Sequence, residues 1–242
     1  MISKNIVLVI DAGNTSIKVG HFQEDTLVGV RCFSNNDMDK FYSYLDENNS
    51  SSRVLSSVLS DKATKNIVEK TNSFLVTTET SIPIRIRYGT KNTLGVDRMC
   101  NAVATSVLLK TAFGVSIDIG TCIKFDLISK NDGYLGGSIA PGINLRYRSL
   151  NDYTGKLPLL FNKSATQLVG NDTNSSIQSG VLNGMNAEIN GLIKMYTEQY
   201  SDLTFFMTGG DARYFDLDSK NDIFADENLT LIGLFEIYKH NG

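Results

Sequence analysis

The same short motif occurs twice in this chain, each time directly after a run of apolar residues. Asp11-Ala12-Gly13-Asn14-Thr15 follows the apolar residues 6–10, and Asp118-Ile119-Gly120-Thr121 follows another apolar stretch 107 residues later. Each motif leads into a second apolar stretch, so both copies predict a strand, an Asp-x-Gly turn and a strand. The offset is far too long for a solenoid repeat. It therefore predicts a duplicated domain whose halves each carry one such turn.

These two turns have the chemistry of a phosphate-binding loop. Glycine permits backbone angles that other residues avoid, and it lets the main chain approach a ligand closely. Exposed backbone N–H groups form a concavity for anions, and hydroxyl donors are available from Thr15, Ser16 and Thr121. The aspartate would repel a phosphate directly, so it suits a cation beside the phosphates. An ordinary hairpin accounts for one copy, but two copies favour phosphate binding.

Composition excludes several other classes of protein. The 242 residues are 41% hydrophobic and 20% charged with a net charge of -3, which predicts a globular chain without the basic face of a nucleic-acid binder. No GxGxxG, GxxxxGK[ST] or GxSxG motif occurs. Two histidines and three distant cysteines argue against a zinc site, a Ser-His-Asp triad and disulfides. No apolar run is long enough for a membrane span or a signal peptide, so we expect a cytoplasmic protein that binds no membrane.

Hydrophobic periodicity predicts an α/β fold in which strands and helices alternate in both halves. Strands are expected at 5–10, 16–22, 26–33, 53–58, 74–78, 84–88, 114–119, 122–128 and 203–207. Helices are expected at 37–47, 61–71, 96–110, 176–200 and 229–240, and residues 133–142 form a glycine-rich segment. Because three strands follow one another at the start, we expect mixed rather than parallel sheets.

Six motifs occur in an order that resembles the type III pantothenate kinases of the actin-like ATPase superfamily. Two of them are phosphate motifs, Asp11-Ala12-Gly13-Asn14-Thr15-Ser16-Ile17-Lys18 and Asp118-Ile119-Gly120-Thr121. A third lies between them, Gly95-Val96-Asp97-Arg98. The others follow in the second half, Gly136-Gly137-Ser138-Ile139-Ala140-Pro141-Gly142, Asp172-Thr173 with Gln178-Ser179-Gly180, and Thr208-Gly209-Gly210-Asp211. The resemblance covers nearly the whole chain.

The resemblance implies a fold, a reaction and an oligomer. The fold is two similar ribonuclease H-like (actin-like ATPase) domains with mixed sheets and an ATP cleft between them, which we place at 1–112 and 113–242. The reaction is the ATP-dependent phosphorylation of pantothenate to 4'-phosphopantothenate, the first step of coenzyme A biosynthesis. The oligomer is a homodimer with the pantothenate pocket close to its interface.

The resemblance also assigns catalysis and substrate binding. Asp97 would be the general base that takes the proton of the pantothenate hydroxyl, and a helix N-cap is the alternative for this residue. Arg98 would pair with an anionic group such as the pantothenate carboxylate, and a surface or salt-bridged arginine is the alternative. The remaining substrate-binding residues are Gly95, Val96, Tyr88 and Thr173. Tyr88 could instead lie at a sheet edge, and Thr173 could cap the helix that follows.

ATP and cation binding are implied for the two phosphate motifs. The ATP-binding residues are Asp11, Ala12, Gly13, Asn14, Thr15, Ser16, Ile17, Lys18 and Thr121, although Lys18 could be a solvated strand residue. Asp11 would hold Mg²⁺ through water, and Asp118 would bind a monovalent cation, K⁺ or NH₄⁺. Lys124 departs from the family, which usually continues the second motif with Ala-x-Thr. We expect Lys124 to lie in water at the sheet edge; if it points to the nucleotide, it could partly replace potassium, so the cation requirement stays open.

Three other functions compete with this interpretation. Another kinase of the superfamily, such as a sugar kinase, is disfavoured by the motif Gly95-Val96-Asp97-Arg98. A non-catalytic accessory transcription regulator is disfavoured because Asp11, Asp97 and Asp118 are all intact. A filament-forming actin-like protein is disfavoured by the short chain. The late Thr-Gly-Gly-Asp motif fits either a turn near the nucleotide or a plain turn, so it is given no role.

Overall fold

The computed structural model describes residues 6–48, 52–164, 166–215, 217 and 223–242. The chain divides into two compact units. Unit 1 comprises Met1–Leu108, Asp132–Leu135 and Asn228–Gly242, and unit 2 comprises Leu109–Asn131 and Gly136–Glu227. The first break lies close to the expected boundary at 112/113, but the C-terminal segment belongs to unit 1 rather than to the second half. Within the described ranges, no helix is long and apolar enough to span a membrane.

Unit 1 contains a mixed five-stranded sheet with the order β3-β2-β1-β4-β5. Its strands are β1 (Ile6–Ala12), β2 (Ser16–Gln23), β3 (Thr26–Ser34), β4 (Ser52–Ser57) and β5 (Phe74–Leu75). The first three strands form an antiparallel meander, whereas β4 pairs in parallel with β1, and β5 pairs in parallel with β4. The mixed sheet expected from the consecutive early strands is confirmed.

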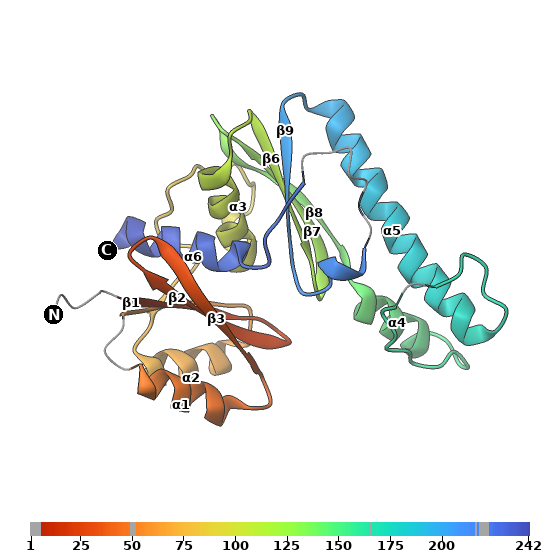
Figure 1. The fold of residues 1–242 in the computed structure, drawn as a ribbon, viewed down its shortest axis with the longest axis horizontal. Helices are drawn as coiled ribbons and strands as arrows, with labels where there is room; N and C mark the ends of the chain where they lie inside the picture. The colour runs from red at the N-terminus through yellow and green to blue at the C-terminus, as the bar shows by residue number, and fades with distance from the viewer. Residues whose placement is uncertain (1–5, 49–51, 165, 216, 218–222) are drawn as a thin grey trace. The chain divides into compact units, whose positions relative to one another are not determined.

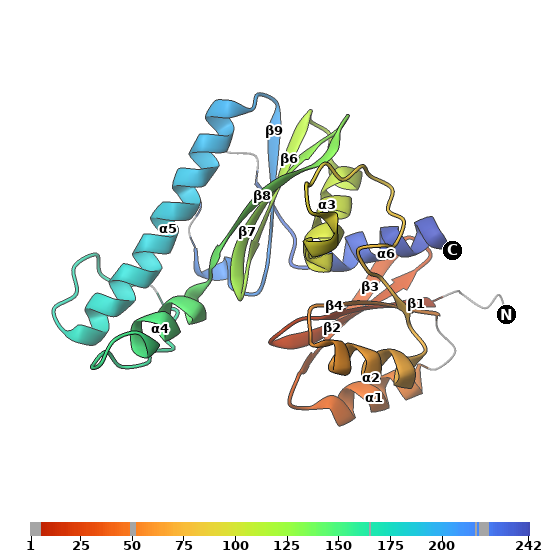
Figure 2. The same ribbon diagram turned by 180° about the vertical axis from the view of Figure 1, so that it is seen from behind.

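Helices cover both faces of this sheet, which is why β1 is a continuous apolar run. Leu8 and Ile10 face a core that contains Phe41 of helix α1 (Met38–Glu47) and Ile67 of helix α2 (Asp61–Thr71). Val9 faces the opposite core, built with helices α3 (Val96–Leu108) and α6 (Leu229–Asn241). Figures 1 and 2 show α1 and α2 together on one side of the sheet and α6 on the other.

Helix α6 belongs to unit 1 because its apolar residues complete that second core. Leu231, Leu234 and Ile237 are fully buried there with Cys100 of α3. The two helices approach so closely that a β-carbon at Gly233 would lie 1.7 Å from the carbonyl oxygen of Cys100. The sequence predicts helix α6, but the position of this helix at the end of the chain does not indicate that it packs in unit 1.

Unit 2 repeats the sheet of unit 1. Its order is β10-β9-β6-β7-β8, in which β6 pairs antiparallel with β7 and parallel with β9. The strands are β6 (Phe113–Ile119), β7 (Cys122–Ser129), β8 (Gly133–Pro141), β9 (Leu203–Thr208) and β10 (Ile223–Ala225), and the first three residues of β8 belong to unit 1. Strand for strand, β6, β7 and β9 take the places of β1, β2 and β4, so the predicted duplication of the fold is confirmed.

Unit 2 also carries helices α4 (Ile143–Asp152) and α5 (Thr173–Gln199). Tyr196 of α5 stacks on Phe125 of β7 with ring centres 5.9 Å apart, which holds the long helix against its sheet. Arg146 of α4 forms a 2.5 Å ion pair with Glu188 of α5. Single 3₁₀ turns lie in unit 1 at η1 (Lys91–Thr93) and in unit 2 at η2 (Ala212–Tyr214).

Among the described residues, the structure differs from the predicted elements mainly at three missed elements and one predicted strand. Strand β8 was hidden by its glycines, which have low strand propensity, and β10 is only three residues long. Helix α4 was not predicted because it buries only Ile143 and Tyr147, too few residues to show a helical period. The strand predicted at 84–88 is wrong: this segment alternates in burial, but it makes only one bridge, between Ile86 and Tyr134.

Candidate functional site

The first Asp-x-Gly turn is a tight connection between β1 and β2. Ala12 pairs with Ile17, and the backbone N–H of Gly13 donates to the carbonyl of Ser16 at 3.0 Å. The residues at the tip, Asn14 and Thr15, are exposed. The turn therefore presents backbone and hydroxyl groups to solvent, as a phosphate-binding loop requires.

Asn35 holds this turn from the end of the neighbouring strand β3. Its side-chain amide donates to the carbonyl oxygens of Gly13 and Asn14, each at 3.0 Å. Sequence reasoning did not find Asn35, because only the β2–β3 pairing brings it beside the turn. Neither Gly13 nor Gly120 has a left-handed backbone, so these turns do not use the extra conformational freedom of glycine.

Asp11 is oriented by a serine on the adjacent strand. Ser56 of β4 lies directly opposite Asp11 in the parallel pairing, and its hydroxyl donates to Oδ1 of Asp11 at 2.9 Å. Ser56 is only 1% exposed, whereas Asp11 is half-buried. A buried donor on a rigid strand fixes the carboxylate with respect to the turn that follows it.

Asp97 lies in the first turn of α3. The carbonyl of Gly95 accepts the backbone N–H of Met99 at 3.1 Å, so Gly95 occupies the N-cap position and the N-cap alternative for Asp97 is wrong. Oδ1 of Asp97 accepts the backbone N–H of Arg98 at 2.9 Å. Val96, between Gly95 and Asp97, is partly buried against the core that α3 shares with α6.

Asp11 and Asp97 both lie within electrostatic reach of the buried Cys100 in unit 1. Burial raises the pKa of the Cys100 thiol well above its usual value, and the carboxylates of Asp11 and Asp97 raise this pKa further. Both carboxylates therefore act on one buried group, although they are 86 positions apart in the sequence. The fold places the aspartate of the first phosphate motif and the aspartate of the Gly-x-Asp-Arg motif around the same buried thiol.

Arg98 is enclosed by two tyrosine rings. Its guanidinium carbon lies 5.7 Å from the ring centre of Tyr88 and 5.9 Å from that of Tyr134. Arg98 is 4% exposed, so the alternative of a surface arginine is wrong. Two hydrogen bonds of 2.9 Å join the backbone of Tyr134 to Arg85 and Arg87, just before Tyr88. No sequence signal indicated Tyr134, which comes from the glycine-rich segment.

The second turn is one residue shorter than the first. Ile119 pairs with Ile123, and the backbone N–H of Gly120 donates to the carbonyl of Cys122 at 3.0 Å. Thr121 is exposed at the tip. Because one residue is missing, the strand partner of Asp118 is Lys124, just as the strand partner of Asp11 is Lys18.

Lys124 and Asp118 form an ion pair within unit 2. Nζ of Lys124 lies 2.7 Å from Oδ2 of Asp118, and each side chain is 14% exposed. The expectation that Lys124 lies in water at the sheet edge is wrong, because Lys124 stands directly opposite Asp118 and not on an edge strand. An oxygen of Asp118 that a monovalent cation would bind already contacts an ammonium.

Two later glycine motifs meet the second turn. Gly142 donates its N–H to the carbonyl of Thr121 at 3.0 Å, and a β-carbon at Gly142 would lie 2.1 Å from the carbonyl oxygen of Gly120. Gly209 has a φ of +99°, and a β-carbon there would lie 2.3 Å from the carbonyl oxygen of Ile119. These motifs need glycine because their backbones pass so close to the turn.

Thr173 is the first residue of α5 and is exposed. The N-cap of α5 is Asp172, whose carboxylate accepts the backbone N–H of Ser175 in a capping box, so the N-cap alternative for Thr173 is wrong. Thr173 belongs to unit 2, whereas Tyr88 and the motif at 95–98 belong to unit 1.

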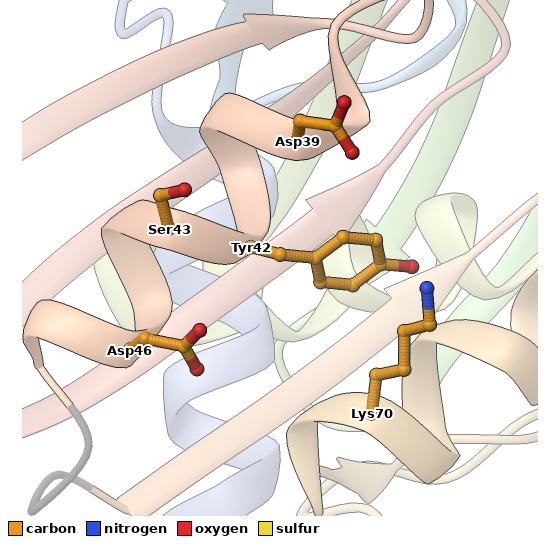
Figure 3. A pocket seen from close by; sticks show the side chains of 5 residues that line it. All are labelled: Asp39, Tyr42, Ser43, Asp46 and Lys70. Atoms are coloured by element: carbon orange, nitrogen blue, oxygen red, sulfur yellow. The ribbon is translucent and has the colours of Figure 1, made fainter.

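A separate hollow lies on the surface of unit 1, between α1 and α2. It is lined by Asp39, Tyr42, Ser43, Asp46 and Lys70, and Nζ of Lys70 lies 4.5 Å from the ring centre of Tyr42 (Figure 3). No residue of the predicted site lines it.

In the part of the chain that the structure describes, no group of three or more His, Cys, Asp or Glu residues could hold a metal ion.

Comparison with known proteins gives matches along most of the chain. The family model described as type III pantothenate kinase matches residues 7–195. A protein named type III pantothenate kinase from Christiangramia forsetii is 39% identical over 97% of this chain and 98% of its own, and one from Flavobacterium johnsoniae is 36% identical over the same shares.

Solved structures share the fold. A Baf family protein of Campylobacter jejuni has a TM-score of 0.61 at 22% identity, covering 97% of this chain and 98% of its own. MreB5 of Spiroplasma citri, solved with ADP, has a TM-score of 0.53 at 12% identity, covering 98% and 99%. At these identities the likeness concerns the actin-like architecture alone.

Proposed function

The chain belongs to the type III pantothenate kinase family, and from this premise we propose that it phosphorylates pantothenate with ATP, the first step of coenzyme A biosynthesis. The observation that supports this most directly is the shared effect of Asp11 and Asp97 on Cys100. A kinase needs a phosphate site beside a group that accepts the proton of the attacking hydroxyl. Unit 1 carries both groups that we propose for these roles, the first turn with Asp11 and the carboxylate of Asp97.

We propose Asp97 as the general base. The primary hydroxyl oxygen of pantothenate forms a bond to the γ-phosphorus of ATP, while the bond from that phosphorus to the β,γ-bridging oxygen breaks and ADP leaves with its electron pair. The hydroxyl proton passes to the carboxylate of Asp97. The backbone N–H of Arg98 holds Oδ1 of Asp97 at 2.9 Å, which keeps the carboxylate in one orientation.

Arg98 is proposed to pair with the carboxylate of pantothenate. The rings of Tyr88 and Tyr134 lie beside the guanidinium, and a planar fork pairs with a carboxylate through two hydrogen bonds. Gly95, Val96 and Thr173 are the other substrate-binding residues that we propose.

Residues 11–18 are proposed to hold the phosphates of ATP, with Thr121 adding a hydroxyl contact. Mg²⁺ usually keeps most of its waters and is bound by one or two carboxylates together with the phosphates. The single carboxylate of Asp11, fixed by Ser56, fits this mode. When bound, Mg²⁺ would neutralise phosphate charge. Asp118 does not fit a monovalent cation in the same way, because its Oδ2 already pairs with Lys124.

We also propose that the protein is a homodimer. The connection between α4 and α5 exposes four large apolar side chains by 68–89%: Tyr153, Phe161, Leu168 and Val169. Large apolar side chains left this exposed on one connection are candidates for an interaction surface. A second copy of the chain is the occupant that the family suggests.

The test is ADP release from purified protein with Mg·ATP, with and without pantothenate. We expect ADP formation that depends on pantothenate and falls by about 100-fold or more in Asp97→Asn, which keeps the size of the side chain. An unchanged melting temperature of the variant controls for folding. Activity with a sugar in place of pantothenate would instead favour another kinase of the superfamily, and no acceptor-dependent ADP release at all would overturn the proposal.

A further inference from the structure

The ion pair between Lys124 and Asp118 stands at the place where the family resemblance expects a monovalent cation. We propose that the ε-ammonium of Lys124 is a built-in replacement for that cation, so that this kinase works without K⁺ or NH₄⁺. The inference rests on the proposed kinase function, because a cation requirement has meaning only for an active enzyme.

The sheet fixes the ammonium in position. Lys124 and Asp118 are direct partners in the antiparallel pairing of β6 and β7, which runs residue by residue from Phe113–Ser129 to Ile119–Ile123. The atoms in contact, Nζ and Oδ2, are 2.7 Å apart. Both strands are central in their sheet, since β9 lies beside β6 and β8 lies beside β7. Lys124 therefore stays beside Asp118 without a change of register.

The ammonium of Lys124 can neutralise Asp118 without a second cation. Asp118 ends the strand before the second phosphate turn, and its side chain is only 14% exposed, so its negative charge needs a nearby counterion. An ammonium carries the same single charge as K⁺ and can donate three hydrogen bonds. A tethered ammonium is present at a high effective concentration, so a free monovalent cation would have to displace it.

The first turn of the molecule has an equivalent strand register. Lys18 is the strand partner of Asp11, as Lys124 is of Asp118, even though the two turns differ by one residue in length. An alignment by sequence offset places Ile17 with Lys124 and hides this equivalence. Lys124 therefore occupies the position of a lysine that we assign to phosphate binding.

The first experiment uses the unmodified protein. Pantothenate-dependent ADP release is measured in potassium chloride and in tetramethylammonium chloride at equal ionic strength, with every reagent free of potassium and ammonium. We expect the two rates to agree within about twofold, because at equal ionic strength both salts screen charges to the same extent. A rate that rises steeply with potassium would overturn the inference while leaving the kinase function intact. Absence of pantothenate-dependent activity in every salt would instead count against the proposed function itself.

The second experiment tests whether loss of the Lys124 ammonium makes the enzyme dependent on a monovalent cation. Lys124→Met removes the charge and nearly keeps the length of the side chain, so we expect activity in tetramethylammonium to fall by roughly 10-fold to 100-fold, the usual effect of losing a hydrogen bond to a charged group. Potassium or ammonium should restore much of it. Lys239→Met is the matched control, because Lys239 is also ion-paired, to Asp25 at 3.0 Å, but lies outside the site. That variant should gain no response to potassium.

A readout without catalysis completes the test. In Lys124→Met, the carboxylate of Asp118 has lost its partner, so potassium should raise the melting temperature of this variant more than that of the unmodified protein. An equal response of both proteins would contradict a cation-replacing role. If Lys124→Met fails to fold, the salt comparison on the unmodified protein still decides the question.

Discussion

A β-carbon at position 95 would lie 2.5 Å from Oδ1 of Asp97, so the proposed base occupies space that only glycine leaves open. The neighbouring carbonyl of Gly95 also starts helix α3 through its bond to Met99. One residue thus sets both the beginning of the helix and the position of the carboxylate.

Gly95→Ala should therefore impair catalysis more than stability. The carboxylate of Asp97 can rotate away from the new methyl group, so the free energy of unfolding should fall by only about 1 kcal/mol, the cost of alanine at an N-cap. We expect kcat to fall by roughly tenfold or more, because the base is displaced. Gly191→Ala on helix α5 is the control, since a β-carbon there meets nothing within 4 Å. Unchanged kcat in Gly95→Ala would contradict the placement of the base.

Ser56→Ala should weaken the binding of Mg·ATP. The hydroxyl of Ser56 donates to Oδ1 of Asp11 at 2.9 Å, and a hydrogen bond to a charged group contributes about 1.5–3 kcal/mol, so we expect roughly a tenfold or larger rise in KM for Mg·ATP. KM for pantothenate should change little, because Ser56 positions Asp11 alone. A magnesium titration checks the assignment: the variant should need more Mg²⁺. An equal rise in both KM values would indicate a general structural defect.

Phe161→Glu should break the proposed homodimer. Phe161 is 68% exposed, so the substitution costs the isolated chain little, but a buried carboxylate would disrupt an apolar interface. Sedimentation at micromolar concentration should show a dimer for the unmodified protein and a monomer for the variant. Lys194→Glu changes an exposed residue of α5 to the same side chain and should leave the dimer intact. A monomeric unmodified protein would contradict the prediction.

His21→Gln should reduce the acid sensitivity of unit 1. Burial lowers the pKa of His21 below its ordinary value of 6.5, and the charge of Arg31 lowers this pKa further. The unfolded chain therefore takes up a proton first as the pH falls below 6.5, and stability is lost until the pH drops below the folded pKa. Melting temperatures between pH 7 and pH 5 should fall less steeply in His21→Gln. Parallel curves for both proteins would show that another group controls the acid response.

The helices show how much of the secondary structure local sequence predicts. The helices predicted at 61–71 and 229–240 coincide almost fully with α2 and α6. Helix α4 was not predicted, because a helix that buries only two side chains leaves no apolar period in its sequence. The assignment of α6 to unit 1 depends on the core it completes, which is a property of packing rather than of the helix.

The candidate site shows the same division. Sequence alone indicated Asp11, Asp97 and Arg98, because their motifs have a recognisable order. It could not indicate Asn35 or Tyr134. Strand pairing brings Asn35 beside the first turn, and the bridge to Ile86 brings Tyr134 beside the segment that contains Tyr88. For Lys124 the sequence-based expectation of a solvated edge residue was wrong, since a turn shortened by one residue changes which side chains face each other.

The sequence by itself determined that this chain is a duplicated α/β protein with two Asp-x-Gly turns, because repeated motifs and apolar periods are local properties of the chain. Tertiary structure alone decided that Asp11 and Asp97 act on one buried thiol, that two tyrosines enclose Arg98, and that Lys124 pairs with Asp118. Those relationships depend on strand register and helix packing, which bring together residues that are distant in sequence and fix the distances on which charge interactions depend.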